Sequence, residues 1–207
     1  MGALRVKDDA EGLLRAAAAL REGKVVIFPT DTVYGIGAAA EHDDACQRLF
    51  DLKGRATTKA IPILIAAATD LDRVVESVPE TARKLMRRFW PGGLTIVFRR
   101  HPSFRSAALA GGDTVAVRIP DDLRSRALIN AAGGLLAATS ANASGRPSPV
   151  TADEAAAQLP DADLVVDGGP CPGGVESTVV DVTVDPPRIL REGAIPASAI
   201  EAALADP

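Results

Sequence analysis

The stretch from Lys24 to Gly37, KVVIFPTDTVYGIG, constrains the fold of this chain more than any other. Its apolar run, residues 25–28, predicts a buried strand. Pro29 ends the hydrogen-bonding of that strand because it has no N–H to donate. The polar group Thr30, Asp31 and Thr32 follows at once. Two interpretations stay open on local physics: a strand that delivers hydroxyls to a cleft, or a strand end closed by a side-chain-capped turn.

Apolar segments with strand and helix patterns alternate along the whole chain, which predicts an α/β fold. Polar and cationic loops recur where the predicted strands end, the usual place for an open binding cleft in such a sheet. We expect strands at 25–28, 61–66, 94–98, 114–119, 135–138, 163–167 and 188–190. We expect helices at 8–22, from 43, at 79–89, at 121–132, from 151 and at 196–204.

Length and composition place the chain among ordinary globular proteins. Its 207 residues fit one domain, with 47% hydrophobic and 24% charged residues. No apolar run approaches the about 20 residues that a membrane helix needs, and we expect no signal peptide, so the predicted location is the cytoplasm. Cys46 and Cys171 match neither a disulfide framework nor a zinc site, and no metal site is predicted. The net charge of −4 counts against a generally basic nucleic-acid binder, although a local basic patch remains open.

Three cations, Lys53, Arg55 and Lys59, lie close together before a predicted strand. Lys53 ends a predicted helix, where a cation favourably meets the helix dipole, and this alone could explain its presence. It does not explain Lys59. A compact anion site suited to a triphosphate is the other interpretation.

Two later strand ends carry polar groups that also admit two interpretations. Arg118 lies two residues before Pro120, at the end of a predicted strand. Either it is an edge residue whose guanidinium reaches into solvent, or its planar guanidinium binds a carboxylate. The loop after the strand at 135–138 holds Ser140, Asn142 and Ser148. These side chains either form turns or surround a phosphate and a nucleoside.

The motifs PTDTVYGIG, KGR followed by Lys59, and TSANASGRPSP, in this order and spacing, resemble the YrdC/TsaC family. STVVD at 177–181 and the R-x-G at Arg191 are similar to family segments as well. The match runs from about 25 to 191. The resemblance implies a YrdC-like single domain over 1–207, a twisted mixed sheet flanked by helices, in the short form without a further C-terminal domain.

Proteins of that family are L-threonylcarbamoyladenylate synthases, which act in making the t6A base of tRNA. The resemblance therefore implies that threonine and bicarbonate form N-carboxythreonine, whose carboxylate attacks the α-phosphate of ATP and expels pyrophosphate. Mg²⁺ would arrive with ATP as substrate, and no tightly bound cofactor is expected. Downstream t6A transferase proteins are the implied partners.

The resemblance also implies roles for individual residues. Thr32, Tyr34, Arg118 and Ser177 would form the threonine side, with Arg118 on the carboxylate. Lys53, Arg55 and Lys59 would position the phosphates electrostatically. The residues implied for ATP binding are Arg55, Lys59, Ser140, Asn142, Ser148 and Arg191. Ala56 stands where many relatives have proline after K-x-R, which leaves the geometry around Lys59 open.

Two rival functions remain at this stage. The first is a double-stranded RNA or tRNA-binding module of the same fold without synthase activity, and weak RNA binding could also accompany the synthase. The second is a carbamoyl-adenylate enzyme of hydrogenase maturation, whose known examples are large multidomain proteins with segments that this chain lacks.

Overall fold

The computed structural model describes residues 3–54 and 56–205 and arranges them around a ten-stranded sheet. The strands are β1 (Leu4–Lys7), β2 (Val26–Phe28), β3 (Gly35–Ala39), β4 (Ile63–Ile65), β5 (Leu94–Arg99), β6 (Thr114–Arg118), β7 (Leu135–Ser140), β8 (Leu164–Asp167), β9 (Thr178–Asp181) and β10 (Arg188–Arg191). The helices are α1 (Ala10–Arg21), α2 (Asp43–Lys53), α3 (Glu80–Phe89), α4 (Leu123–Ala131), α5 (Ala152–Gln158) and α6 (Ala197–Ala205), with 3₁₀ turns η1 (Ala68–Arg73) and η2 (Ala107–Leu109).

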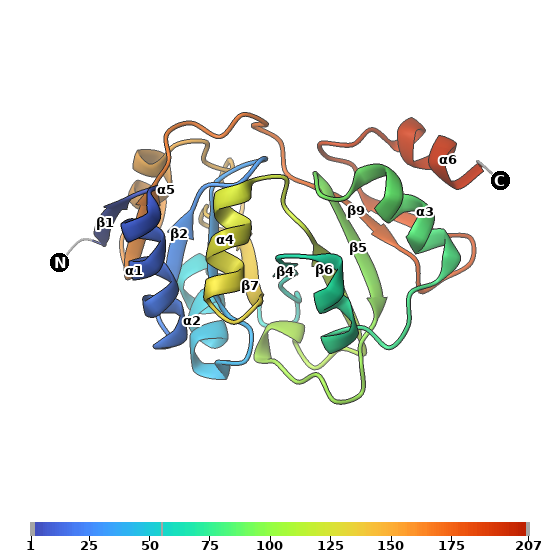
Figure 1. Cartoon of the computed structure of the whole chain (residues 1–207), viewed down its shortest axis with the longest axis horizontal. Helices are drawn as coiled ribbons and strands as arrows, with labels where there is room; N and C mark the ends of the chain where they lie inside the picture. The colour runs from blue at the N-terminus through green and yellow to red at the C-terminus, as the bar shows by residue number, and fades with distance from the viewer. Residues whose placement is uncertain (1–2, 55, 206–207) are drawn as a thin grey trace.

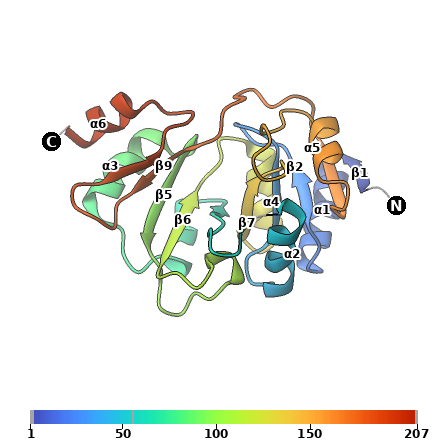
Figure 2. The same cartoon turned by 180° about the vertical axis from the view of Figure 1, so that it is seen from behind.

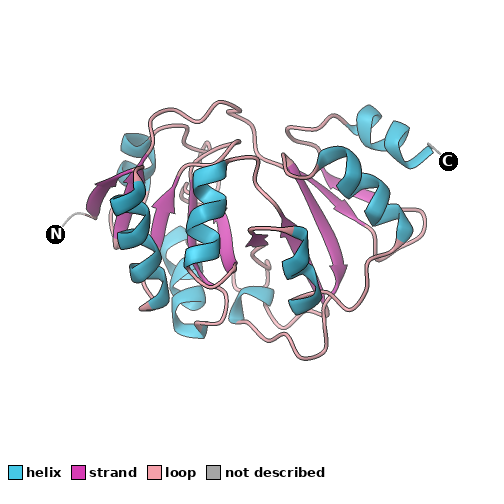
Figure 3. Cartoon of the chain, viewed as in Figure 1, coloured by secondary structure: helices cyan, strands magenta, loops and turns pink. Residues whose placement is uncertain are grey.

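The sheet is mixed, and its strands are far from chain order. The order across it is β1-β8-β2-β3-β7-β4-β6-β5-β9-β10. β8 runs parallel to both β1 and β2, whereas β3 and β7 are antiparallel to each other. β4 pairs parallel with β6, and β5 pairs parallel with β9. This arrangement confirms the predicted α/β fold with a mixed sheet flanked by helices, which Figure 3 shows by element type.

Alternating side chains in the strands divide the core into two clusters, one on each face of the sheet. In β2, Val26 and Phe28 belong to one cluster while Ile27 belongs to the other. α1 and α4 cover the Phe28 face, and they lie in front of the sheet in Figure 1. α2 and α5 pack against the Ile27 face and come to the front in Figure 2. The period of two thus lets β2, β4, β7 and β8 contribute side chains to both layers.

Local signals in the sequence set the helix ends. Asp9 caps α1 by accepting a hydrogen bond from the Gly12 N–H at 2.9 Å. Thr151 and Glu154 form a capping box at the start of α5. The predicted helices and strands recur with ends shifted by a residue or two. β1 was not predicted, because LRVK is short and charged and becomes a strand only by pairing with β8.

Among the described residues, no helix is long and apolar enough to cross a membrane. The assignment of the whole chain to a single domain stays a prediction.

Candidate active site

A cleft of about 300 Å³ opens on the sheet face that carries Phe28 and Leu64, beyond the part covered by α1 and α4. Small side chains on neighbouring strands leave this space: Gly35 on β3, Ala138 on β7 and Ala116 on β6. The polar side chains that line it are Thr30, Thr32, Thr95, Arg118, Thr139, Glu176, Ser177 and Arg191.

Arg118, the last residue of β6, is buried in the wall of the cleft and held by three acceptors. Its Nε donates to the Gly92 carbonyl at 2.9 Å, one terminal nitrogen donates to Thr32 Oγ1 at 3.0 Å, and the other donates to Asp31 Oδ1 at 2.6 Å. Burial lowers the pKa of Arg118 and the nearby Asp31 charge opposes that effect, yet an arginine stays charged at any ordinary pH. A fixed, desolvated guanidinium therefore faces the cleft.

The two threonines after Pro29 form a hydrogen-bond chain whose direction can be worked out. The Thr30 hydroxyl donates its one hydrogen to the Val33 carbonyl at 2.8 Å. The contact between Thr30 Oγ1 and Thr32 Oγ1, 3.0 Å, must then take its hydrogen from Thr32. Because Thr32 also accepts from Arg118, it presents only a lone pair to a ligand. The segment after β2 therefore delivers hydroxyls to a cleft, and the capped turn is part of how it does so.

A second polar cluster lies where β9 begins. Ser177 Oγ shares a hydrogen bond of 2.8 Å with Thr95 Oγ1 on β5. Arg191, at the end of β10, donates from Nε and NH2 to the Ser177 carbonyl at 3.1 and 2.7 Å. Its NH1 forms an ion pair with the Glu176 carboxylate. This cluster joins three strands of the sheet at one edge of the cleft.

Tyr34 is fully buried and ties two loops to the strand segment that carries it. Its hydroxyl donates to the Gly169 carbonyl at 2.8 Å and accepts from the Gly168 N–H at 3.2 Å. Its main-chain N–H donates to the Pro149 carbonyl at 2.9 Å. Burial raises the pKa of Tyr34 to about 12, so the hydroxyl keeps its hydrogen. The side chain anchors the glycine-rich loop, residues 168–174, and does not line the cleft.

That glycine-rich loop packs directly on the threonine segment. The Gly174 N–H donates to the Thr32 carbonyl at 2.8 Å. A Cβ built on Gly173 would lie 2.7 Å from the Asp31 carbonyl oxygen, so only glycine permits this approach.

Lys53 and Asn142 are buried together and shape the loop after β7. Lys53 Nζ donates to the Ser140 carbonyl and, at 3.4 Å, to Asn142 Oδ1. The Asn142 amide donates to the Arg146 carbonyl at 2.7 Å. Both side chains are thus occupied by loop groups.

The predicted site residues separate into three groups. Thr32, Arg118, Ser177 and Arg191 line the cleft together, although the chain separates them widely. Tyr34, Lys53, Lys59, Ser140, Asn142 and Ser148 are not among the lining residues, and their ligand contacts stay predictions. Arg55 lies outside the described residues.

Two acidic side chains of the site went unpredicted. Asp31 pairs with Arg118, and Glu176 pairs with Arg191 and Ser148. Each is adjacent in sequence to a motif residue, and that adjacency was the available signal. Among the described residues, no group of three or more His, Cys, Asp or Glu side chains could hold a metal ion.

The fold and cleft define an α/β protein with a buried arginine and a hydroxyl-rich binding site at the centre of a mixed sheet. The family model Sua5/YciO/YrdC, described as "Telomere recombination", matches residues 18–193. This chain belongs to that family, as the motifs predicted.

Several curated relatives and solved structures are similar to this chain. Threonylcarbamoyl-AMP synthase of Bacillus subtilis is 44% identical over 195 residues, which cover 93% of this chain and 56% of that protein. A putative threonylcarbamoyl-AMP synthase of Mycobacterium tuberculosis is 38% identical over 185 residues, covering 89% of this chain and 85% of that protein. The crystal structure of Sua5 from P. abyssi in complex with L-threonine superposes with a TM-score of 0.92 at 40% identity, covering 98% of this chain and 60% of that one.

The chain spans little more than half the length of the first curated relatives that it matches, 56% and 55%.

Proposed function

We propose that this protein is an L-threonylcarbamoyladenylate synthase, which converts L-threonine, bicarbonate and ATP to threonylcarbamoyl-AMP and pyrophosphate for tRNA t6A modification. The observation that carries the proposal is the position of Arg118, whose buried guanidinium is held beside Thr32 in the cleft. The chain also belongs to the family in which this activity is found. A planar, desolvated fork is well suited to an amino acid carboxylate. The likeness to a family structure that holds L-threonine supports the same assignment.

The chemistry of the reaction suits a site without a metal cage or a strong general base. The threonine nitrogen gains a carboxylate from bicarbonate with loss of water. An oxygen of that carboxylate then attacks the α-phosphorus of ATP, and the bond to the bridging oxygen of pyrophosphate breaks. Positioning and charge neutralisation supply most of the catalysis in such a step. Mg²⁺ arrives with ATP as part of the substrate.

On the threonine side, Arg118 takes the carboxylate, and the lone pair of Thr32 is placed for a donor of the substrate. Ser177 adds a polar contact from the adjacent cluster. On the nucleotide side, Ser148 and Arg191 lie next to one another through Glu176. Lys59 and Arg55 are proposed for the phosphates from the family motif alone. The product would pass to t6A transferase proteins in the cytoplasm.

Pyrophosphate release tests this function. We expect release from ATP and Mg²⁺ only when L-threonine and bicarbonate are both present. Pyrophosphate release that does not depend on threonine, or no release although ATP is bound, would overturn the proposal.

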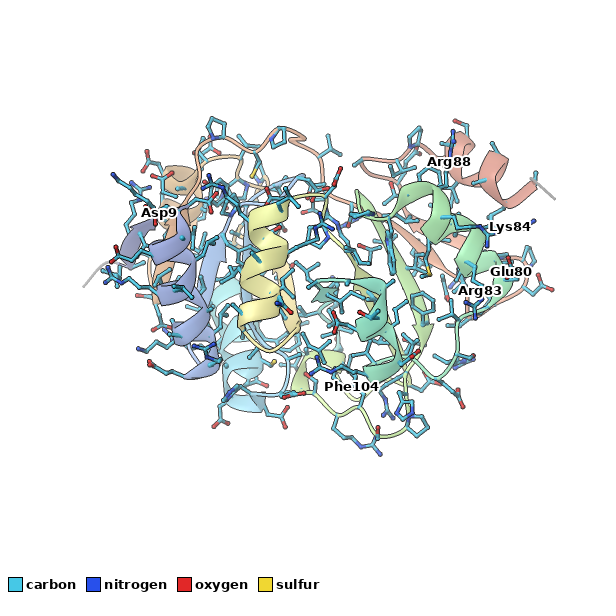
Figure 4. The ribbon with its side chains drawn as sticks, in the orientation of Figure 1. Asp9, Glu80, Arg83, Lys84, Arg88 and Phe104 are labelled. Carbon is cyan, nitrogen blue, oxygen red and sulfur yellow. The ribbon has the colours of Figure 1, made fainter. Side chains whose placement is uncertain are left out.

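An RNA-binding role has one specific observation in its favour, a group of cations on helix α3. Lys53 is buried, so it cannot serve as a surface contact to phosphate. Helix α3 carries four cations, of which Arg83, Arg87 and Arg88 are exposed and Lys84 is partly buried, and Figure 4 labels Arg83, Lys84 and Arg88 along it. Glu80 forms ion pairs with Arg83 and Arg87, which offsets part of that charge. A steep salt dependence of RNA affinity that is lost on substituting α3 would support this second function.

A further inference from the structure

Glu176 is the one acidic side chain among the described residues that line the cleft. It directly precedes Ser177 and β9, and its carboxylate bridges two separate segments. The Ser148 hydroxyl donates to Oε1 at 2.5 Å, and Arg191 NH1 donates to Oε2. About a third of the side chain is exposed, 31%, so one edge of this bridge faces the cleft.

The close packing of the chain fixes where Glu176 sits. The Ala194 N–H donates to the Glu176 carbonyl at 2.8 Å. A Cβ on Gly193 would lie 2.2 Å from that same carbonyl oxygen, so the two segments touch at main-chain distance. The carboxylate is thereby held between Ser148 and Arg191 rather than free to move away.

The Ser148 hydroxyl has only one hydrogen, so whether it donates to or accepts from a ligand can be worked out. Burial on its own would raise the pKa of Glu176, but the Ser148 hydrogen bond and the Arg191 charge, together with smaller effects of Ser140 and Lys53, outweigh it and hold that pKa below its usual value. Glu176 is therefore an ionised acceptor at neutral pH, and the single hydroxyl hydrogen of Ser148 is committed to it. Toward a ligand, Ser148 offers lone pairs only.

This polarity excludes one class of ligand atom and selects another. Phosphate oxygens of ATP are acceptors at neutral pH, so they cannot receive a hydrogen bond from Ser148 while Glu176 holds its hydrogen. Ribose hydroxyls and the adenine amino group carry hydrogens that they can donate. Arg191 is likewise committed to Glu176 through its NH1, and the Lys53 charge also acts on that carboxylate.

We propose that Glu176 is a positioning residue that makes Ser148 a hydrogen-bond acceptor for the nucleoside part of ATP. The donor is a ribose hydroxyl or the adenine amino group, and the phosphates bind elsewhere in the cleft. This inference rests on the proposed function, since it concerns the nucleotide side of that site.

The test is calorimetric binding of ATP and of inorganic triphosphate to the wild type, to Glu176→Ala, which removes the acceptor of the Ser148 hydrogen, and to Ser148→Ala. Loss of one hydrogen bond predicts about 5- to 10-fold weaker ATP binding in both variants. Inorganic triphosphate, which lacks the nucleoside, should bind Ser148→Ala like the wild type, and it should bind Glu176→Ala no more weakly, because that change uncovers the Arg191 charge. Glu201→Gln removes the same charge from the exposed surface of α6 and should change neither affinity. A general loss of structure would weaken both ligands together.

Three ATP analogues then identify the donor: 2′-deoxy-ATP, 3′-deoxy-ATP and purine riboside triphosphate, which lacks the amino group. The analogue without the donor should bind the wild type more weakly and be insensitive to Ser148→Ala. Equal weakening of ATP and triphosphate in the variants, or unchanged ATP binding in both, would overturn the inference while leaving the synthase assignment intact. A wild type that binds neither ligand would overturn both. If Glu176→Ala does not fold, Ser148→Ala decides alone.

Discussion

The ion pair between Arg118 and Asp31 supports the sharpest prediction about this protein. Arg118 is buried and Asp31 is largely buried, with side-chain exposed fractions of 8% and 14%, and their charged atoms approach to 2.6 Å. Arg118→Ala removes the cation together with the donors to Gly92, Thr32 and Asp31. The Asp31 carboxylate would then be left in the interior without a partner.

The magnitude follows from that uncompensated charge. Removing one partner of a buried pair costs about 3–5 kcal/mol of stability, a large share of the about 5–15 kcal/mol of a typical domain. Adding Asp31→Asn to Arg118→Ala removes the orphaned charge, so the double variant should regain about 1–3 kcal/mol. Threonine binding should not return with it, because the guanidinium is still missing.

Urea denaturation measures the stability, and calorimetry measures threonine affinity in the variants that stay folded. We expect a binding loss of about 2–5 kcal/mol, roughly 30-fold to several thousand-fold, in the double variant. Arg99→Ala is the matched control, since Arg99 is a half-exposed strand arginine paired with Asp113, and it should cost about 1 kcal/mol or less. A double variant that binds threonine normally, or an Arg118→Ala protein as stable as the control, would refute the reasoning.

Three further predictions concern the loops around the cleft. Tyr34→Phe loses the bonds to Gly168 and Gly169 and should cost about 1–3 kcal/mol in urea denaturation with threonine affinity unchanged; a selective loss of threonine affinity would instead place the hydroxyl in the site. Gly193→Ala forces a Cβ onto the Glu176 carbonyl, 2.2 Å away, and should weaken ATP binding more than threonine binding, whereas equal binding of both would mean that the contact is easily relaxed. The pKa of Glu176 is lower in the folded protein than its ordinary 4.5, so its contribution to stability is complete above that value and is lost as the pH falls through the folded pKa. The difference in unfolding free energy between wild type and Glu176→Gln should therefore shrink on acidification from about pH 6 to about pH 3, and a constant difference would contradict the pKa shift.

Much of the site could be predicted because its residues stand at strand ends inside recognisable motifs. Thr32 follows a proline that stops β2, and Arg118 precedes a proline at the end of β6. The α/β pattern implied that such ends converge, and both side chains do line one cleft. The strand order could not be predicted, since pairs such as β5 with β9 join segments far apart in the chain.

The direction of a charged side chain was the hardest property to predict. Lys53 shows this, because α2 turns its side chain inward, where Nζ donates to the Ser140 carbonyl, while its role at the phosphates stays a prediction. Asp31 and Glu176 became important only because the fold brings an arginine to each of them, across 87 and 15 residues of chain. Sequence patterns give the residue type and the position on an element, whereas partners from distant strands depend on the assembled sheet.

The measurement that tests the central claim most directly is the fate of isotope-labelled bicarbonate. The protein would be incubated with ATP, Mg²⁺, L-threonine and the label, and the adenylate product would be analysed by mass spectrometry. We expect a labelled threonylcarbamoyl-AMP that does not form without threonine. It should not form either with the double variant Arg118→Ala, Asp31→Asn. An unlabelled adenylate of threonine, or a labelled product that forms without Arg118, would contradict it.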